Sequence, residues 1–353
     1  MSKKNKSKTF KNHNDINDIN YLKVENLRLR KIIESLKETI KKFDLEKNPM
    51  NQINILKKFH IQTKNKIIIK VSFFPCGNFV LISINNIQIW SLKDQKIIQE
   101  IKNEHKENIT SLSIKNDNFF ITSSLDLSIK IWSKNSTNNK FICSETISNV
   151  HSSSIIKIYI EPISNNIYSC SFDETLKIWN KPLKSNKYQN ITVLPQENGV
   201  CTFLIINEYN YLVTSGVAGT IFYDYTTYNI IKIFQDIKSY NQECMKLFNY
   251  NKIIIGDRNL SIINLINMEI VIEIFNVFDC WCICVLDEVF LTGGSCQNIR
   301  IYRKDNYELI NTIYDAHKGD INGIVEINFE NYQLYSYSND GTINFYKIEK
   351  NFI

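Results

Sequence analysis

The sequence has no long apolar run. Nowhere among its 353 residues is there a stretch of about 18 uncharged apolar side chains, the length that a transmembrane helix requires. The most apolar region, residues 262–291, is interrupted by Glu269, Glu273, Asp279 and Asp287. We therefore expect buried strands there and no integral membrane association. No apolar segment follows the lysine-rich N-terminus, which argues against a secretory signal.

Glycine and proline are scarce, with 10 and 5 residues, and there are nine cysteines. No glycine-rich loop precedes a helical pattern, so the sequence offers no phosphate-binding loop. An odd number of cysteines without paired spacing suits a reducing compartment and predicts an intracellular, cytoplasmic protein. Cys280, Cys282 and Cys284 alternate along a predicted strand and lack the further ligands of a zinc site, so we interpret them as small buried side chains. We expect no cofactor and no metal.

Most of the chain carries no net charge. Residues 51–353 carry 29 basic and 29 acidic side chains, with three arginines, whereas residues 1–50 carry 13 basic and 7 acidic ones. A neutral region this poor in arginine argues against nucleic-acid binding. The basic tail, residues 1–15, is predicted to be disordered, and a nuclear-import signal there would give a nuclear location.

What the chain does contain is a repeat of about forty residues. The phrases SLDLSIKIW, SFDETLKIW and SNDGTINFY end at Trp132, Trp179 and Tyr346. Weaker copies place equivalent positions at 90, 224, 263 and 302, which makes seven units. Each unit contains four short alternating segments, typical of four strands; in the second unit these are 109–114, 119–123, 128–132 and 141–147.

This repeat resembles the WD-repeat family of β-propellers. The resemblance implies an all-β, seven-bladed ring over residues 48–353. Only seven residues follow Tyr346, too few for an outer strand, and residues 53–59 have the pattern of one. We expect 53–59 to complete the last blade, which would leave no open sheet edge.

The family also implies a buried hydrogen-bonded chain of His, Ser or Thr, Asp and Trp in each intact unit. Carried over by position, three sets result, the last with Tyr in place of Trp: His105, Thr122, Asp126 and Trp132; His151, Ser169, Asp173 and Trp179; His317, Ser336, Asp340 and Tyr346. Three copies of a Ser/Thr–His–Asp set point to scaffold and not to catalysis. His60 is assigned the matching place in the first unit and His13 lies in the tail, so no histidine is left for an acid–base site.

A second pattern covers residues 16–47. Leu22, Leu29, Leu36 and Phe43 fit heptad positions d, and Ile19, Asn26, Ile33 and Ile40 fit positions a. Isoleucine at a and leucine at d favour a parallel two-stranded coiled coil, in which Asn26 would fix the register. The sequence therefore predicts a helix that forms a homodimer or pairs with a helical partner. A single amphipathic helix packed on its own propeller remains open.

The function that follows is a non-catalytic scaffold for protein partners. In the family, the residue before each turn Asp points to the face around the central channel, which here gives Leu125, Phe172 and Asn339. Leu125 and Phe172 either form an apolar contact for a partner or pack under neighbouring loops. An alternative is a regulatory subunit resembling a G-protein β subunit or a ubiquitin-ligase adaptor. A propeller hydrolase would require carboxylates or histidines converging on the channel mouth, and the sequence shows no such cluster.

Overall fold

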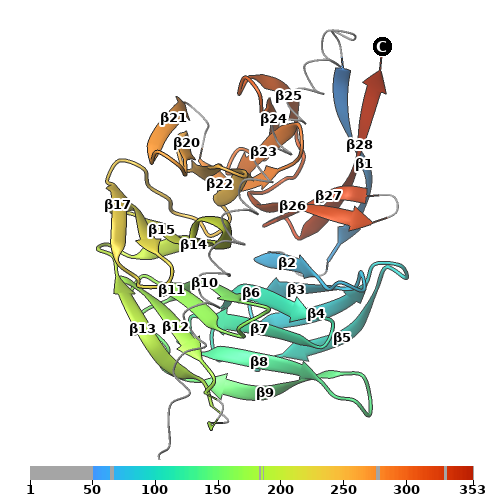
Figure 1. Ribbon diagram of the computed structural model, residues 1–353. Coiled ribbons are helices and arrows are strands. Elements are labelled where there is room, and N and C mark those ends of the chain that lie inside the picture. The colour runs from blue at the N-terminus through green and yellow to red at the C-terminus, as the bar shows by residue number, and fades with distance from the viewer. Residues whose placement is uncertain are drawn as a thin grey trace, which may run out of the picture.

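The computed structural model describes residues 51–63, 67–182, 184–185, 187–275, 279–329 and 332–352. Within them the chain forms seven four-stranded antiparallel sheets, which stand around a ring as the blades of a propeller (Figure 1). The all-β, seven-bladed fold predicted from the repeat is therefore confirmed. The predicted coiled coil, residues 16–47, and the tail before it lie outside the described residues.

Each blade contains four strands, which follow one another from the channel to the rim. The innermost strands are β2 (Lys70–Phe73), β6 (Ile109–Asn116), β10 (Ile155–Ile160), β14 (Val200–Ile206), β18 (Met245–Asn249), β22 (Cys280–Val285) and β26 (Ile321–Phe329). The second strands are β3 (Phe79–Ser83), β7 (Phe119–Ser124), β11 (Ile167–Ser171), β15 (Tyr211–Gly216), β19 (Lys252–Gly256), β23 (Val289–Gly294) and β27 (Tyr332–Ser338).

The third strands are β4 (Asn86–Ser91), β8 (Ile129–Lys134), β12 (Thr175–Asn180), β16 (Gly219–Asp224), β20 (Leu260–Asn264), β24 (Ile299–Arg303) and β28 (Thr342–Phe352). The outer strands are β5 (Lys96–Lys102), β9 (Phe141–Ile147), β13 (Gln189–Pro195), β17 (Ile230–Phe234), β21 (Glu269–Ile274), β25 (Leu309–Ile313) and β1 (Asn51–Gln62). A short 3₁₀ helix, η1 (Asn207–Tyr209), connects β14 and β15.

The first strand of the chain closes the ring. β1 pairs antiparallel with β28, from Asn51 opposite Phe352 to Gln62 opposite Thr342. Figure 1 shows these two strands, one near each end of the chain, side by side. The pairing is longer than residues 53–59, because β28 continues past Tyr346 and offers backbone partners to both ends of β1.

The same irregularity recurs in all seven blades. The register between the third and outer strands shifts at Trp90, Trp132, Trp179, Tyr223, Ile263 and Tyr302, and in the last blade opposite Tyr346. The sequence alignment placed Asp224 at this position in the fourth unit, and that assignment is wrong by one residue. The turn between β15 and β16 is short, with Gly216 directly opposite Gly219, so Tyr223 and not Asp224 takes the buried place.

The core lies between blades instead of in one centre. Seven hydrophobic clusters each combine residues of two neighbouring blades. For example, Ile121 and Ile131 of the second blade pack with Ile158 and Trp179 of the third. Each fully buried isoleucine of this kind contributes about 1.5–3 kcal/mol. The repeat is thus stable only as a closed series of neighbours.

Candidate functional site

The clearest polar constellation is the hydrogen-bonded chain of the second blade. His105 Nδ1 lies 3.0 Å from Asp126 Oδ2, and His105 Nε2 lies 2.8 Å from Thr122 Oγ1. The indole of Trp132 donates to the same Thr122 oxygen at 2.9 Å. A continuous chain of bonds results when a neutral imidazole donates from Nδ1 and accepts at Nε2.

The third and seventh blades repeat this arrangement. His151 contacts Asp173 at 2.9 Å and Ser169 at 2.7 Å, and Trp179 donates to Ser169 at 3.0 Å. In the seventh blade, His317 Nδ1 bonds Thr342 at 2.8 Å and lies 3.3 Å from Asp340. His317 Nε2 lies 2.6 Å from Ser336, which is 3.0 Å from the hydroxyl of Tyr346. Tyrosine reaches the serine through its hydroxyl, so the aromatic substitution keeps the hydrogen bond.

Burial fixes the protonation of these groups. It lowers the pKa of His105 and His151, and the nearby aspartates only partly oppose the effect. Burial on its own raises the pKa of Asp173, but hydrogen bonds from Thr175 and from the Ser152 N–H bring it below its ordinary value. A neutral histidine beside an ionised aspartate is therefore the resting state. Because Ser169 has no exposed surface, a substrate cannot reach its hydroxyl.

The fourth blade has a substitute for the histidine. The buried Gln196 accepts a hydrogen bond from Thr214 at 2.5 Å and donates to the carbonyl of Gly219 at 2.8 Å. Gln196 precedes Thr214 by 18 residues, the spacing that separates His151 from Ser169. Sequence reasoning missed this residue, although the spacing was available as a signal. By contrast, His60 is exposed on β1, before the connection to β2 starts, and it does not take the network position assigned to it.

The three residues expected on the channel-mouth face occupy equivalent turns. The N–H groups of Leu125, Phe172 and Asn339 donate to the carbonyls of Asn108, Ser154 and Asp320, which precede the innermost strands of their blades. Leu125 and Phe172 are 38% and 49% exposed, and Asn339 is half-buried.

The side chain of Phe172 lies over the next blade. A Cβ on Gly199 would come within 3.0 Å of its ring, and Gly199 has a φ of +91°. Glycine at this position therefore allows both the turn and the close approach of the ring.

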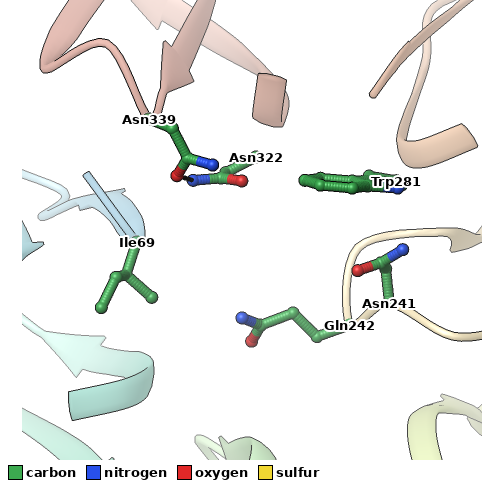
Figure 2. A pocket seen from close by; sticks show the side chains of 6 residues that line it. All are labelled: Ile69, Asn241, Gln242, Trp281, Asn322 and Asn339. Atoms are coloured by element: carbon green, nitrogen blue, oxygen red, sulfur yellow. Dashed lines mark hydrogen bonds between the residues drawn. The ribbon is translucent and has the colours of Figure 1, made fainter. Parts of the chain in front are cut away.

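A cavity of about 230 Å³, here called the mouth cavity, opens beside Asn339 (Figure 2). It is lined by Ile69, Asn241, Gln242, Trp281, Asn322 and Asn339, which come from the first, fifth, sixth and seventh blades. Figure 2 shows the indole of Trp281 extending toward the middle of the cavity from one side, opposite the Asn322–Asn339 hydrogen bond of 2.7 Å. Leu125 and Phe172 do not line this cavity.

Trp281 was not selected from the sequence. It lies between Cys280 and Cys282, which are both buried, where the register of the β22–β23 pair shifts. Figure 2 shows its side chain directed into the mouth cavity. The three cysteines are buried side chains: burial raises the pKa of Cys284 to about 12 and holds those of Cys280 and Cys282 well above their ordinary value. In the described part of the chain, no group of three or more metal-binding side chains converges.

Hydrogen bonds and ion pairs join blades across the channel. Gln242, which precedes β18 in the fifth blade, accepts from Ser111 at 2.9 Å and donates to the carbonyl of Thr110 at 3.1 Å, both in the second blade. The next residue, Glu243, pairs with Lys70 of the first blade at 2.8 Å and with Lys246 at 2.6 Å. Residues that precede β18 of the fifth blade therefore contact the first and second blades across the channel.

The predicted coiled-coil seam, Ile19 to Phe43, lies outside the described residues. Across the ranges that the structure does describe, there is no helix with the length and hydropathy that a membrane crossing requires.

The comparisons agree with the two most complete units. The family model described as "WD domain, G-beta repeat" matches residues 95–133 and 141–180. These segments contain the networks of His105 and His151, and each starts in the outer strand of one blade and ends in the third strand of the next. No curated protein matches the chain.

Proposed function

The chain belongs to the WD-repeat family of β-propellers, and we propose that it is a non-catalytic scaffold that holds a partner protein on the channel-mouth face. Propellers of this family typically serve as platforms for protein interactions. His105, His151 and His317, with their partner hydroxyls and aspartates, are used in the buried networks.

The observation that carries the proposal is the mouth cavity. An aromatic ring, Trp281, and the amides of Asn241, Gln242 and Asn322 border it. The Gln242 amide is engaged with Ser111 and Thr110, and the Asn322 amide donates to Ile68 and Asn339. Within the described part of the chain, the Asn241 amide and the Asn322 oxygen are left to bond an extended peptide backbone, and a tryptophan offers an apolar anchor. The exposed Leu125 and Phe172 stand on the same face in adjacent blades and would extend the contact.

Affinity purification with mass spectrometry tests this face. We expect Trp281→Ala and Phe172→Ala each to remove at least one partner that the wild type retains. The matched control is Ile163→Ala, because Ile163 is 91% exposed in the turn between β10 and β11, at the other end of the innermost strand. Loss of the same partners in all three variants, or in none, would count against the proposal.

For residues 16–47 we propose a coiled coil that forms a homodimer or holds one helical partner. The support is the heptad pattern of Ile19, Leu22, Asn26, Leu29, Ile33, Leu36, Ile40 and Phe43. Analytical ultracentrifugation should show a dimer that becomes monomeric on Leu29→Asp plus Leu36→Asp. A monomeric wild type at micromolar concentration would exclude the homodimer. Partners lost on deletion of residues 1–47 would then belong to the helix.

A further inference from the structure

A second, larger cavity lies deeper in the channel. This inner cavity has a volume of about 450 Å³. Its walls continue the strands that start at the mouth cavity: Ile69 lines the mouth and Lys70 to Phe73 line the inner cavity, while Gln242 lines the mouth and Glu243 lines the inner cavity. The volume is within the range of small-molecule sites.

The charged groups of the inner cavity do not balance. Three ammonium groups, of Lys70, Lys157 and Lys246, face it together with two carboxylates, of Glu161 and Glu243. Glu243 is shared by Lys70 and Lys246. Glu161 accepts hydrogen bonds from Ser164 and Tyr225. Counted over the described residues, the lining therefore carries one excess positive charge.

The excess charge is located at Lys157. Its ammonium donates to Thr202 Oγ1 and to the carbonyl of Phe203, both at 3.0 Å, and lies 5.3 Å from the centroid of the Phe203 ring. All these partners are neutral. Among the described residues, no carboxylate lies within 4.0 Å of this ammonium, whose third N–H is not used by these two bonds.

Apart from these charged groups, most residues that line the wall are apolar or aromatic, and those that are partly exposed include Phe73, Ile114, Tyr159, Leu204 and Val325. Such a surface favours a ligand with a hydrocarbon body over a fully hydrated ion.

We propose that the inner cavity binds a monocarboxylate with an apolar body, and that the carboxylate pairs with Lys157. A buried ammonium without a carboxylate partner is unfavourable. A ligand with a single negative charge neutralises the excess positive charge of the lining and leaves no excess negative charge. A charge-assisted bond to the carboxylate would use the third N–H of the ammonium. A dianion such as phosphate would overcompensate the charge and leave the apolar wall without a partner.

Calorimetric titration of the full chain in low-chloride buffer tests the proposal, with hexanoate as probe and hexanamide as its neutral control. We expect hexanoate to bind at least tenfold more tightly than hexanamide. Lys157→Met should weaken hexanoate binding at least tenfold. Lys232→Met, on the exposed outer strand β17, should leave it unchanged. Equal binding of hexanoate and hexanamide, or no binding of hexanoate by a folded protein together with failure of the peptide below, would overturn the proposal.

A second arm distinguishes the source of the carboxylate. A short peptide ending in leucine is titrated with a free and with an amidated C-terminus. Binding of the free form alone, lost in Lys157→Met, assigns the site to a chain end, and binding of hexanoate alone assigns it to a small molecule. Phosphate binding as tight as that of either carboxylate would refute the ligand class.

The variant itself should fold, because methionine keeps the length of the side chain and removes a buried charge. Its thermal unfolding transition and circular dichroism spectrum check this directly. The proposal is separate from the scaffold function, since Trp281→Ala changes the mouth cavity and should leave hexanoate binding intact. Failure of one proposal therefore does not imply failure of the other.

Discussion

The ammonium of Lys70 lies 2.8 Å from Glu243, and both side chains are only 10% exposed. Lys70 begins the innermost strand of the first blade and Glu243 precedes that of the fifth, 173 residues later in the chain. Although burial on its own raises the pKa of Glu243, the ammonium groups of Lys246, Lys70 and Lys157 lower it well below its ordinary value. The ion pair thus joins two distant blades across the channel.

Glu243→Gln should destabilise the protein by about 3–5 kcal/mol, because it leaves two ammonium groups in the channel without their carboxylate. Chemical denaturation measures the change in the free energy of unfolding. The control is Lys96→Met, which removes an exposed pair with Asp94 at 4.0 Å and should cost less than about 1 kcal/mol. Equal effects of the two substitutions would contradict the role of the cross-channel pair.

Asp173→Ala should reduce the free energy of unfolding by about 1–3 kcal/mol, because the His151 imidazole and the Ser152 N–H lose their acceptor. The exposed Asp236 provides a matched control, and Asp236→Ala should change little. If both variants melt as the wild type does, the network of this blade does not contribute to stability.

The protein should lose stability as the pH falls below 6.5. Since burial lowers the pKa of His151, the unfolded state binds a proton in this range that the folded state does not, and protons then favour unfolding. Below about 4, Asp173 adds to the loss, because its folded pKa lies under the ordinary 3.8.

His151→Gln tests the origin of this acid sensitivity. Gln196 serves the fourth blade in the same position, so glutamine can keep the bond to Ser169 without a titrating group. The fall in melting temperature between pH 6.5 and 5 should be smaller in the variant than in the wild type. An identical fall would exclude His151 as a contributor.

At alkaline pH, Lys157 should make the folded protein more stable as the pH rises. Burial lowers its pKa from 10.5 to about 8, against the attraction of Glu243. Between these values the unfolded state binds more protons, so the wild type should gain up to about 3 kcal/mol over Lys157→Met from pH 8 to 10.5.

Other groups around Lys157 remain in both proteins. Lys70, Lys246 and Glu243 are unchanged, and burial raises the pKa of Cys170 to about 12, so its thiol remains neutral over most of this range. The difference in the free energy of unfolding between the two proteins isolates the lysine. A constant difference from pH 8 to 10.5 would show that Lys157 titrates normally.

Deleting residues 1–60 should leave an aggregating or unfolded protein, whereas deleting 1–47 should leave a folded one. The longer deletion removes most of β1 and exposes the backbone edge of β28. Thermal melts of both truncations measure the effect. Equal stability would show that β1 is not needed to close the ring.

The repeat positions were predictable because local pattern and packing agree there. Trp132 faces Phe120 across the strand pair with ring centroids 5.7 Å apart, and Trp90 with Phe79 and Tyr302 with Phe290 repeat this pair. A buried aromatic at a fixed place in each unit leaves a periodic signal. The signal failed at Asp224 because a shortened turn moved the aromatic by one residue.

The channel residues left no such signal. Lys70, Lys157 and Glu243 do not belong to the repeat pattern and lie in blades that are far apart in the sequence. A lysine on a strand ordinarily indicates a solvated face. Gln242 reaches Ser111 only because the ring brings the fifth blade opposite the second. No spacing rule connects residues 131 positions apart.

By itself the sequence determined the number of blades and the strand that completes the last of them, because each depends on local alternation and on a unit that must pack against its neighbour. Ring closure alone decided which side chains meet in the channel. These are a tryptophan among amides at the mouth and, deeper in the channel, a lysine that has no carboxylate partner among the described residues. Contacts across the channel arise only when all seven units are in place.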